Sequence, residues 1–195
     1  NGEITNAAGE KFTTVVQIGI GGSDLGPRAM YIALENWAKK NNAFKMEAKF
    51  ISNVDPDDAA AVLASTDVAH SIFVLVSKSG TTLETLTNES FVKDALKKAG
   101  LDPSKHMIAV TSETSPLAKS DDYLDAFFMD DYIGGRFSST SSVTSFSTLV
   151  SSANLFTSIS HLVYLLNKPF QYFQIYTLLM PLLFHKAFLL DQLPK

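Results

Sequence analysis

The stretch VVQIGIGGSDLGPRAM, Val15–Met30, joins an apolar, β-branched run to a glycine-rich turn and then to helix-forming sequence. Glycines let a backbone approach an anion closely, and a helix that follows presents its unpaired N–H groups and positive dipole end. A dinucleotide fingerprint from Gly19 would need glycine where Asp24 stands, and a P-loop ending at Gly26 would need lysine where Pro27 stands. Taken alone, the stretch fits either an anion-binding unit or a tight turn without a ligand.

Outward from this stretch, short apolar runs alternate with longer segments of helical composition, as in a parallel sheet covered on both faces. The predicted fold class is α/β, with a doubly wound, mainly parallel five-stranded sheet of flavodoxin-like type and helices on both faces. Each run is short and mostly apolar, as expected of strands buried on both sides. The expected strands are Thr13–Ile18, Ala48–Ile51, Ser71–Val76, Met107–Val110 and Ala126–Met129, with a helix over Pro27–Lys40.

Two further helices have start and stop signals. Asp55 precedes Pro56, which places an N-cap carboxylate before a proline at the first helical position. Thr81 and Glu84 have capping-box spacing, which predicts Thr81 as the N-cap of a helix that Gly100 ends.

A second candidate loop, SKSGTT, follows the strand expected over Ser71–Val76. In open α/β sheets, ligands lie beyond the carboxyl ends of the strands, so the first and third strand loops can converge on one site. Hydroxyls and loop N–H groups can hold a phosphate without a metal. Capping by Thr81 is expected as well, but it does not require the residues before it. The hydroxyls concerned are Ser23, Ser77, Ser79, Thr81 and Thr82, with Lys78 in the same loop.

A third motif, YIGGRFS, covers Tyr132–Ser138. Two glycines before Arg136 allow the backbone to swing the guanidinium into a cleft, where a permanent cation can stabilise an oxyanion. A surface arginine in a salt bridge is the alternative. Its position after the fifth expected strand favours the functional interpretation.

Composition excludes several classes. The chain has 195 residues, 46% of them hydrophobic, and a net charge of -4, which predicts one main globular domain and no nucleic-acid footprint. It contains no cysteine, and its four histidines lack metal-ligand spacing, so neither a disulfide nor a metal is expected. The chain opens on Asn1 without a signal peptide, which favours the cytoplasm and suggests a fragment of a longer protein.

Together, IGIGGSDLGP at 18–27, SKSGTTLET at 77–85 and GGRFSSTSSV at 134–143 resemble the glucose-6-phosphate isomerase family, in its amino-terminal sugar isomerase (SIS) domain. The resemblance covers 13–143. It implies a glycolytic isomerase without a cofactor that interconverts glucose 6-phosphate and fructose 6-phosphate through an enediolate, often as a homodimer. It also implies roles for the matching residues: phosphate binding by Gly22, Ser23, Ser77, Lys78, Ser79, Thr81 and Thr82, substrate contact by Gly135, and enediolate stabilisation by Arg136.

The family pattern is not followed after Val143. We therefore expect an SIS sugar-phosphate-binding domain over 1–143 and a divergent, apolar tail over 144–195. No glutamate follows Glu113, so the base that the resemblance places in a second domain is missing, and neither His161 nor His185 has a catalytic motif. An isomerase polypeptide with an incomplete site is the leading hypothesis. A non-catalytic sugar-phosphate-binding module and an unstable fragment are the alternatives.

The tail invites its own prediction. From 144 it is rich in Ser, Leu and Phe, and its apolar run over 172–184 is too short to span a membrane and contains Pro181. We expect an out-of-frame translation or a divergent gene end. Sequencing the coding DNA around codon 143 should reveal a single-base shift that restores a family-like second domain. If no shift restores one, the out-of-frame explanation is wrong.

Overall fold

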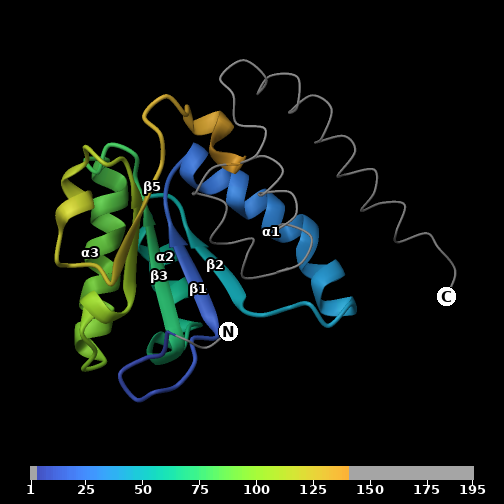
Figure 1. Cartoon of the computed structure of the whole chain (residues 1–195). Helices are drawn as coiled ribbons and strands as arrows, with labels where there is room; N and C mark the ends of the chain where they lie inside the picture. The colour runs from blue at the N-terminus through green and yellow to red at the C-terminus, as the bar shows by residue number, and fades with distance from the viewer. Residues whose placement is uncertain (1–3, 141–195) are drawn as a thin grey trace, which may run out of the picture.

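The structure is a computed structural model that describes residues 4–140. Within them, a single sheet of five strands has the order β2-β1-β3-β4-β5, and every neighbouring pair is parallel (Figure 1). This confirms the predicted α/β fold class. The order reverses between β1 and β3, which is the switch point of a doubly wound sheet. The strands are β1 Thr14–Ile18, β2 Glu47–Ile51, β3 Ser71–Val76, β4 Met107–Thr111 and β5 Asp125–Phe128.

Helices cover both faces of the sheet, as predicted. Tyr31 of α1 belongs to the apolar cluster on one face, together with Val15 and Val74. Ala59 of α2 and Val92 of α3 belong to the cluster on the other face. The helices are α1 Gly22–Lys40, α2 Pro56–Ala64 and α3 Leu83–Lys98, with short 3-10 turns η1 Val68–His70, η2 Pro103–Lys105, η3 Pro116–Lys119 and η4 Gly135–Thr140.

The centre of the sheet is the core. Val16 and Phe73, on neighbouring strands, are fully buried against α2 and α3, while Val15 and Val74 are buried against α1. Full burial of such a side chain contributes about 1.5–3 kcal/mol. Because successive residues of one strand enter opposite clusters, β1 and β3 need helices on both sides.

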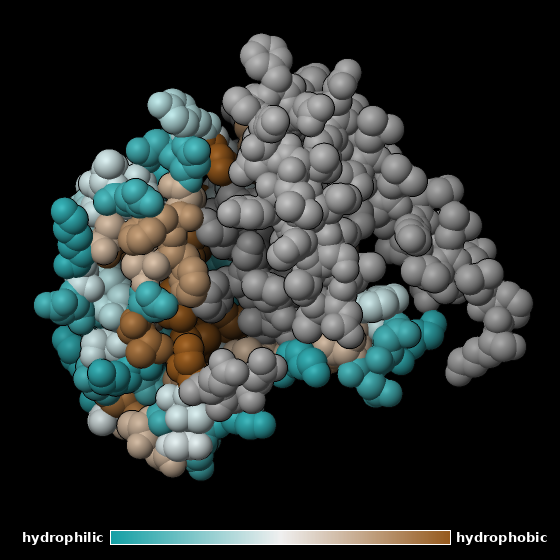
Figure 2. Space-filling view, viewed as in Figure 1, coloured by the Kyte–Doolittle hydropathy of each residue, from teal (hydrophilic) through white to brown (hydrophobic). Residues whose placement is uncertain are grey.

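The edge strand β5 differs from its prediction. Phe127 is 39% exposed and Phe128 is 46% exposed, so β5 is not buried on both faces. The physical reason is its position, because only β4 pairs with it. Figure 2 shows hydrophobic residues gathered towards the middle of the molecule in this view and mainly hydrophilic ones along the rim on the α3 side.

Two helix starts agree poorly with the sequence prediction. The helix expected from Pro27 begins earlier, at Gly22, and encloses the proline. The other begins at Leu83 with Thr82 as N-cap, and no side chain caps it, so the predicted Thr81–Glu84 capping box is wrong. The Thr81 hydroxyl donates to Ser79 Oγ at 3.1 Å instead.

Two other local signals are confirmed. Asp55 caps α2 by accepting hydrogen bonds from the N–H groups of Asp57 and Asp58. Gly100 follows the last turn of α3 with φ at 75°, the left-handed backbone region that favours glycine.

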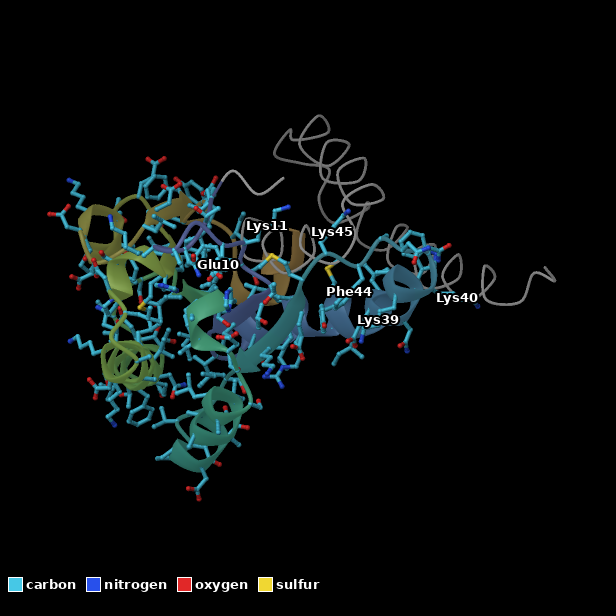
Figure 3. The ribbon with its side chains drawn as sticks, turned by 90° about the horizontal axis from the view of Figure 1, so that it is seen from below. Glu10, Lys11, Lys39, Lys40, Phe44 and Lys45 are labelled. Carbon is cyan, nitrogen blue, oxygen red and sulfur yellow. The ribbon has the colours of Figure 1, made fainter. Side chains whose placement is uncertain are left out.

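The carboxyl end of α1 lies at the amino edge of the sheet. Figure 3, seen from that side, shows Lys39 beside Phe44, the ring over which its ammonium lies at 5.0 Å. Lys39 also pairs with Glu35 at 2.7 Å. A cation at a helix carboxyl end interacts favourably with the dipole. In the described part of the chain, no helix is both long and apolar enough to cross a membrane.

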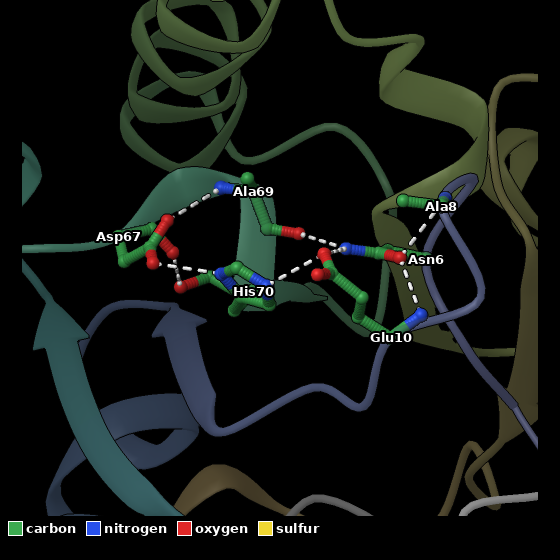
Figure 4. Close-up of polar contacts among 7 residues, drawn as sticks. Asn6, Ala8, Glu10, Asp67, Ala69 and His70 are labelled. Carbon is green, nitrogen blue, oxygen red and sulfur yellow. Dashed lines mark hydrogen bonds and ion pairs between the residues drawn. The ribbon is translucent and has the colours of Figure 1, made fainter.

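A polar cluster ties the segment before β1 to the amino edge (Figure 4). His70 Nδ1 lies 2.7 Å from Asp67 Oδ2, and its Nε2 lies 2.8 Å from Glu10 Oε2. Asn6 donates to Glu10 at 3.2 Å and to the Ala69 carbonyl at 3.1 Å. The Asp67 and Glu10 carboxylates raise the pKa of His70, and His70 in turn lowers the pKa of Asp67.

This cluster predicts a pH dependence of stability. Because the pKa of His70 is raised above 6.5 in the folded chain, the stabilisation is complete below that value and is lost as pH rises through the folded-state pKa. The two carboxylates must also be ionised, so it fades again in acid. We expect the melting temperature of His70→Gln to lie furthest below that of the native chain near pH 5–6 and to converge with it towards pH 9. Parallel curves would contradict this, and Glu10→Gln should reproduce part of the effect.

Candidate functional site

The carboxyl edge of the sheet brings two of the predicted loops together. Ile18 at the end of β1 pairs with Leu75 of β3, so the loops that leave these strands begin side by side. One leads into α1 and the other into α3, on opposite faces of the sheet. Two helix N-termini, each with a positive dipole end, therefore meet at the switch point.

Neither of these helix N-termini carries a side-chain cap. Gly21 precedes α1 and Thr82 precedes α3, and neither provides a side-chain acceptor to the first turn. By contrast, side-chain oxygens of Asp55, Asp67 and Asp102 cap α2, η1 and η2. In α1, however, the N–H groups of Ser23 and Asp24 donate to the carbonyls of Ile20 and Gly21, both at 3.1 Å. Because unpaired N–H groups at a helix start are the donors that an external anion can use, the start of α3 is the better anion-binding end of the two.

The inner part of the hydroxyl loop, 77–82, is a turn closed by hydrogen bonds. Ser77 is 2% exposed, and its hydroxyl donates to Thr82 Oγ1 at 3.1 Å while accepting from the Gly80 N–H at 3.2 Å. Gly80 has φ at 67°, and a Cβ there would lie 2.1 Å from Ser115 Oγ. Glycine is therefore required at this position.

The outer part of the loop faces solvent. Ser79 and Thr81 are exposed, and Ser79 Oγ accepts from the N–H and the hydroxyl of Thr81 at 3.2 and 3.1 Å. Both hydroxyls retain lone pairs, and the Ser79 hydrogen can rotate towards a new acceptor. The loop thus offers hydroxyls at two depths beside the start of α3.

Gly135, from the glycine pair of the third motif, packs against Gly22 of the first motif. A Cβ on Gly22 would lie 2.3 Å from the carbonyl carbon of Gly135, so two backbones touch where only glycine fits. Ser138 Oγ lies 2.8 Å from the Gly22 carbonyl and 2.7 Å from that of Gly135. Figure 1 shows η4 seated beside the start of α1. The side chain of Arg136, the predicted catalytic group, lies outside the described part of the structure.

Lys78 lies in the predicted loop but spans to another one. Its ammonium donates to the carbonyls of Asp131 at 3.0 Å and Ile133 at 3.1 Å, in the segment that leads from β5 to η4. Loops after β1, β3 and β5 therefore form one rim. The predicted phosphate-binding role of Lys78 stays a prediction, as do those of Ser23 and the loop hydroxyls.

Sequence reasoning missed the support beneath Ser23. In a regular helix the Ser23 carbonyl would accept from residue 27, but Pro27 has no N–H. Gln17 of β1, 2% exposed, donates its amide N–H to that carbonyl at 2.6 Å and replaces the lost bond. The available signal was a proline in the first turns of a helix, which leaves the carbonyl of Ser23 without its helix donor, together with a glutamine on the preceding strand.

A second missed contact anchors α1 to β2. The buried carboxylate of Asp24 accepts from Arg28 Nε at 3.0 Å, and the guanidinium lies 4.9 Å from the centre of the Phe50 ring. An acid in the first turn suits the helix dipole. Among residues 4–140, no group of three or more His, Cys, Asp or Glu side chains is arranged to hold a metal ion.

The family model described as phosphoglucose isomerase matches residues 1–164. The chain belongs to the phosphoglucose isomerase family. The family match begins before Thr13 and continues past Val143, so it is longer than the stretch that carries the sequence motifs. The expected domain boundary at 143 stays a prediction, and its tail lies outside the described residues.

Relatives in the phosphoglucose isomerase family agree. Glucose-6-phosphate isomerase of Treponema denticola is 68% identical over 141 residues, 72% of this chain and 26% of that protein. The enzyme of Desulfotalea psychrophila is 55% identical over 142 residues, 73% of this chain and 26% of that protein. The chain therefore spans about a quarter of the length of the curated relatives it matches.

Two solved structures are also similar to this chain. The crystal structure of a glucose-6-phosphate isomerase from Chlamydia trachomatis is 44% identical, with a TM-score of 0.66 over 73% of this chain and 27% of that one. A hypothetical protein from Thermus thermophilus is 30% identical, with a TM-score of 0.61 over 72% of this chain and 33% of that one.

The Gln17–Ser23–Pro27 arrangement predicts a coupling. Gln17→Met removes the amide and leaves the part-buried Ser23 carbonyl without this donor, at a cost of about 1–3 kcal/mol. In a Pro27→Ala background the new N–H can take that carbonyl, so the same substitution should cost about 1 kcal/mol less. Urea unfolding of the four chains measures the difference.

Pro103→Ala, at the opposite edge of the sheet in η2, is the matched control and should combine additively with Gln17→Met. If Gln17→Met costs the same free energy of unfolding in the Pro27→Ala and Pro103→Ala backgrounds, Gln17 does not replace the helix hydrogen bond that Pro27 removes.

Proposed function

We propose that this chain forms the sugar-phosphate-binding part of a glucose-6-phosphate isomerase, with the phosphate held at the rim between β1 and β3. One observation carries the proposal: α1 and α3, whose N-termini have no side-chain cap, begin directly after the loops that follow the neighbouring strands β1 and β3. The family relation supports a phosphorylated sugar as the anion.

The phosphate would be held by fixed dipoles and hydroxyls. First-turn N–H groups of α3 and the exposed hydroxyl of Ser79, which Thr81 orients, are donors on one side, and Ser23 in the first turn of α1 lies on the other. The Ser77–Thr82 hydroxyl pair can turn its remaining hydrogen towards the ligand. Hydrogen bonds to a charged acceptor are the strong ones.

The sugar would extend towards η4. Gly135 is fixed against Gly22, and the residue after it is Arg136, whose guanidinium would stabilise the enediolate formed as glucose 6-phosphate becomes fructose 6-phosphate. Proton transfer between the two sugar carbons needs a positioned base. No glutamate follows Glu113 in the sequence.

The same missing glutamate favours a second candidate, a non-catalytic sugar-phosphate-binding module. An assay that couples fructose 6-phosphate formation to a dehydrogenase separates the two. Turnover above background assigns isomerase activity to the chain, and saturable binding without turnover assigns the module. From the family relation we also propose that the protein is cytoplasmic and forms a homodimer.

Paired substitutions test the phosphate site. Ser77→Ala with Thr82→Ala removes the hydroxyl pair and with it the one hydrogen that the pair can turn towards the phosphate, so the dissociation constant for 6-phosphogluconate should rise at least about tenfold. Calorimetric titration measures it, and ligand at 100 times the dissociation constant should stabilise the native chain by about 2.7 kcal/mol.

Ser90→Ala is the matched control, because its exposed hydroxyl on α3 donates to the Thr87 carbonyl away from the loop. It should bind like the native chain. Equal affinity in the double variant and the control would refute this placement of the phosphate.

A further inference from the structure

Lys78 is anchored through both its backbone and its side chain. Its carbonyl accepts from the Ser112 N–H at 3.1 Å, which ties the residue to the loop after β4. Its half-buried side chain then reaches the carbonyls of Asp131 and Ile133. Two of the three donors of the ammonium are therefore used within the protein.

The segment that Lys78 holds is a closed turn. Asp130 accepts from the N–H of Tyr132 through its carboxylate at 2.9 Å, and from the N–H of Ile133 through its carbonyl at 3.1 Å. These bonds make 130–133 one unit, so an ammonium that binds two of its carbonyls positions the whole turn. Bonds from a charged donor suit this task because they are stronger than neutral ones.

The chain passes from this turn to Gly135 with only Gly134 between them. Gly135 is held on its other side by backbone contact with Gly22 and by Ser138, which bridges the two glycine carbonyls. Two anchors from different loops therefore fix one short segment. Glycines contribute no side-chain packing of their own, so the anchors determine where the segment lies.

We propose that Lys78 is a positioning residue, whose ammonium fixes the 130–133 turn and thereby places Gly135 and Arg136 at the rim. The phosphate is bound by its neighbours in the loop rather than by its side chain. The link to a ligand rests on the proposed function. Lys78 belongs to the loop proposed to bind the phosphate and donates to the turn next to the segment proposed to meet the sugar, so it couples the positions of the two.

Chemical rescue tests the role of the ammonium. The chain has no cysteine, so Lys78→Cys introduces a single thiol. Alkylation with 2-bromoethylamine rebuilds a lysine-like ammonium, whereas iodoacetamide leaves a neutral amide. Lys105→Cys, exposed in η2 and treated identically, is the matched control. Hydrogen exchange of the peptide over 130–137 is the first readout, since local opening sets its rate.

We expect exchange in that peptide to be about tenfold faster in the neutral Lys78→Cys adduct and to return to within about twofold of native in the aminoethyl adduct. Exchange elsewhere and in both Lys105→Cys adducts should match the native chain. Unchanged exchange over 130–137, or no difference between the two adducts, would overturn the proposal.

Binding of two probes separates positioning from direct phosphate contact. Inorganic phosphate should bind the neutral adduct within about threefold of native, while 6-phosphogluconate should lose about tenfold because the segment that meets its sugar is displaced. An equal loss for both probes would make Lys78 a phosphate ligand and refute the assignment. If the native chain binds neither probe, the proposed function fails, while the exchange experiment still decides whether Lys78 holds the turn.

Discussion

The parallel pairing of β1 with β3 is the constraint on which the rest of this molecule depends. Both strands bury side chains on both faces, so the chain must send α1 to one side and α3 to the other. Two helices that leave neighbouring strands in opposite directions separate above the sheet, and their N-termini face the gap between them. The polar rim is thus a consequence of how the apolar core is covered.

The helices at the rim lack the side-chain N-caps that stabilise other helices of the fold. Asp55 caps α2, and an acceptor of this kind is worth about 1 kcal/mol. The helices that meet at the rim have no such cap: their first-turn carboxylates, Asp24 and Glu84, suit the dipole but neither helix has a side-chain cap hydrogen bond. A side-chain cap on α3 would compete with a phosphate for the same N–H groups, so its absence suits an anion site.

Long-range ties hold the rim together in place of local ones. Gln17 supplies the donor that Pro27 lacks, Ser138 bridges two glycine carbonyls, and Lys78 joins the third strand loop to the fifth. Each tie is a side-chain donor that satisfies a backbone carbonyl, a group that normally needs a hydrogen-bond partner. The same bonds that stabilise these loops therefore also set their geometry.

The sequence by itself determined what local chemistry decides: strands from β-branched apolar runs, the α2 start from Asp55 and Pro56, the α3 end from Gly100, and the family from three motifs. The tertiary structure alone decided where α1 begins, because Gln17 offsets a proline that would otherwise mark a helix start. It also decided that Lys78 binds carbonyls more than fifty positions away. Local spacing cannot report such partners, since they meet only once the sheet has formed.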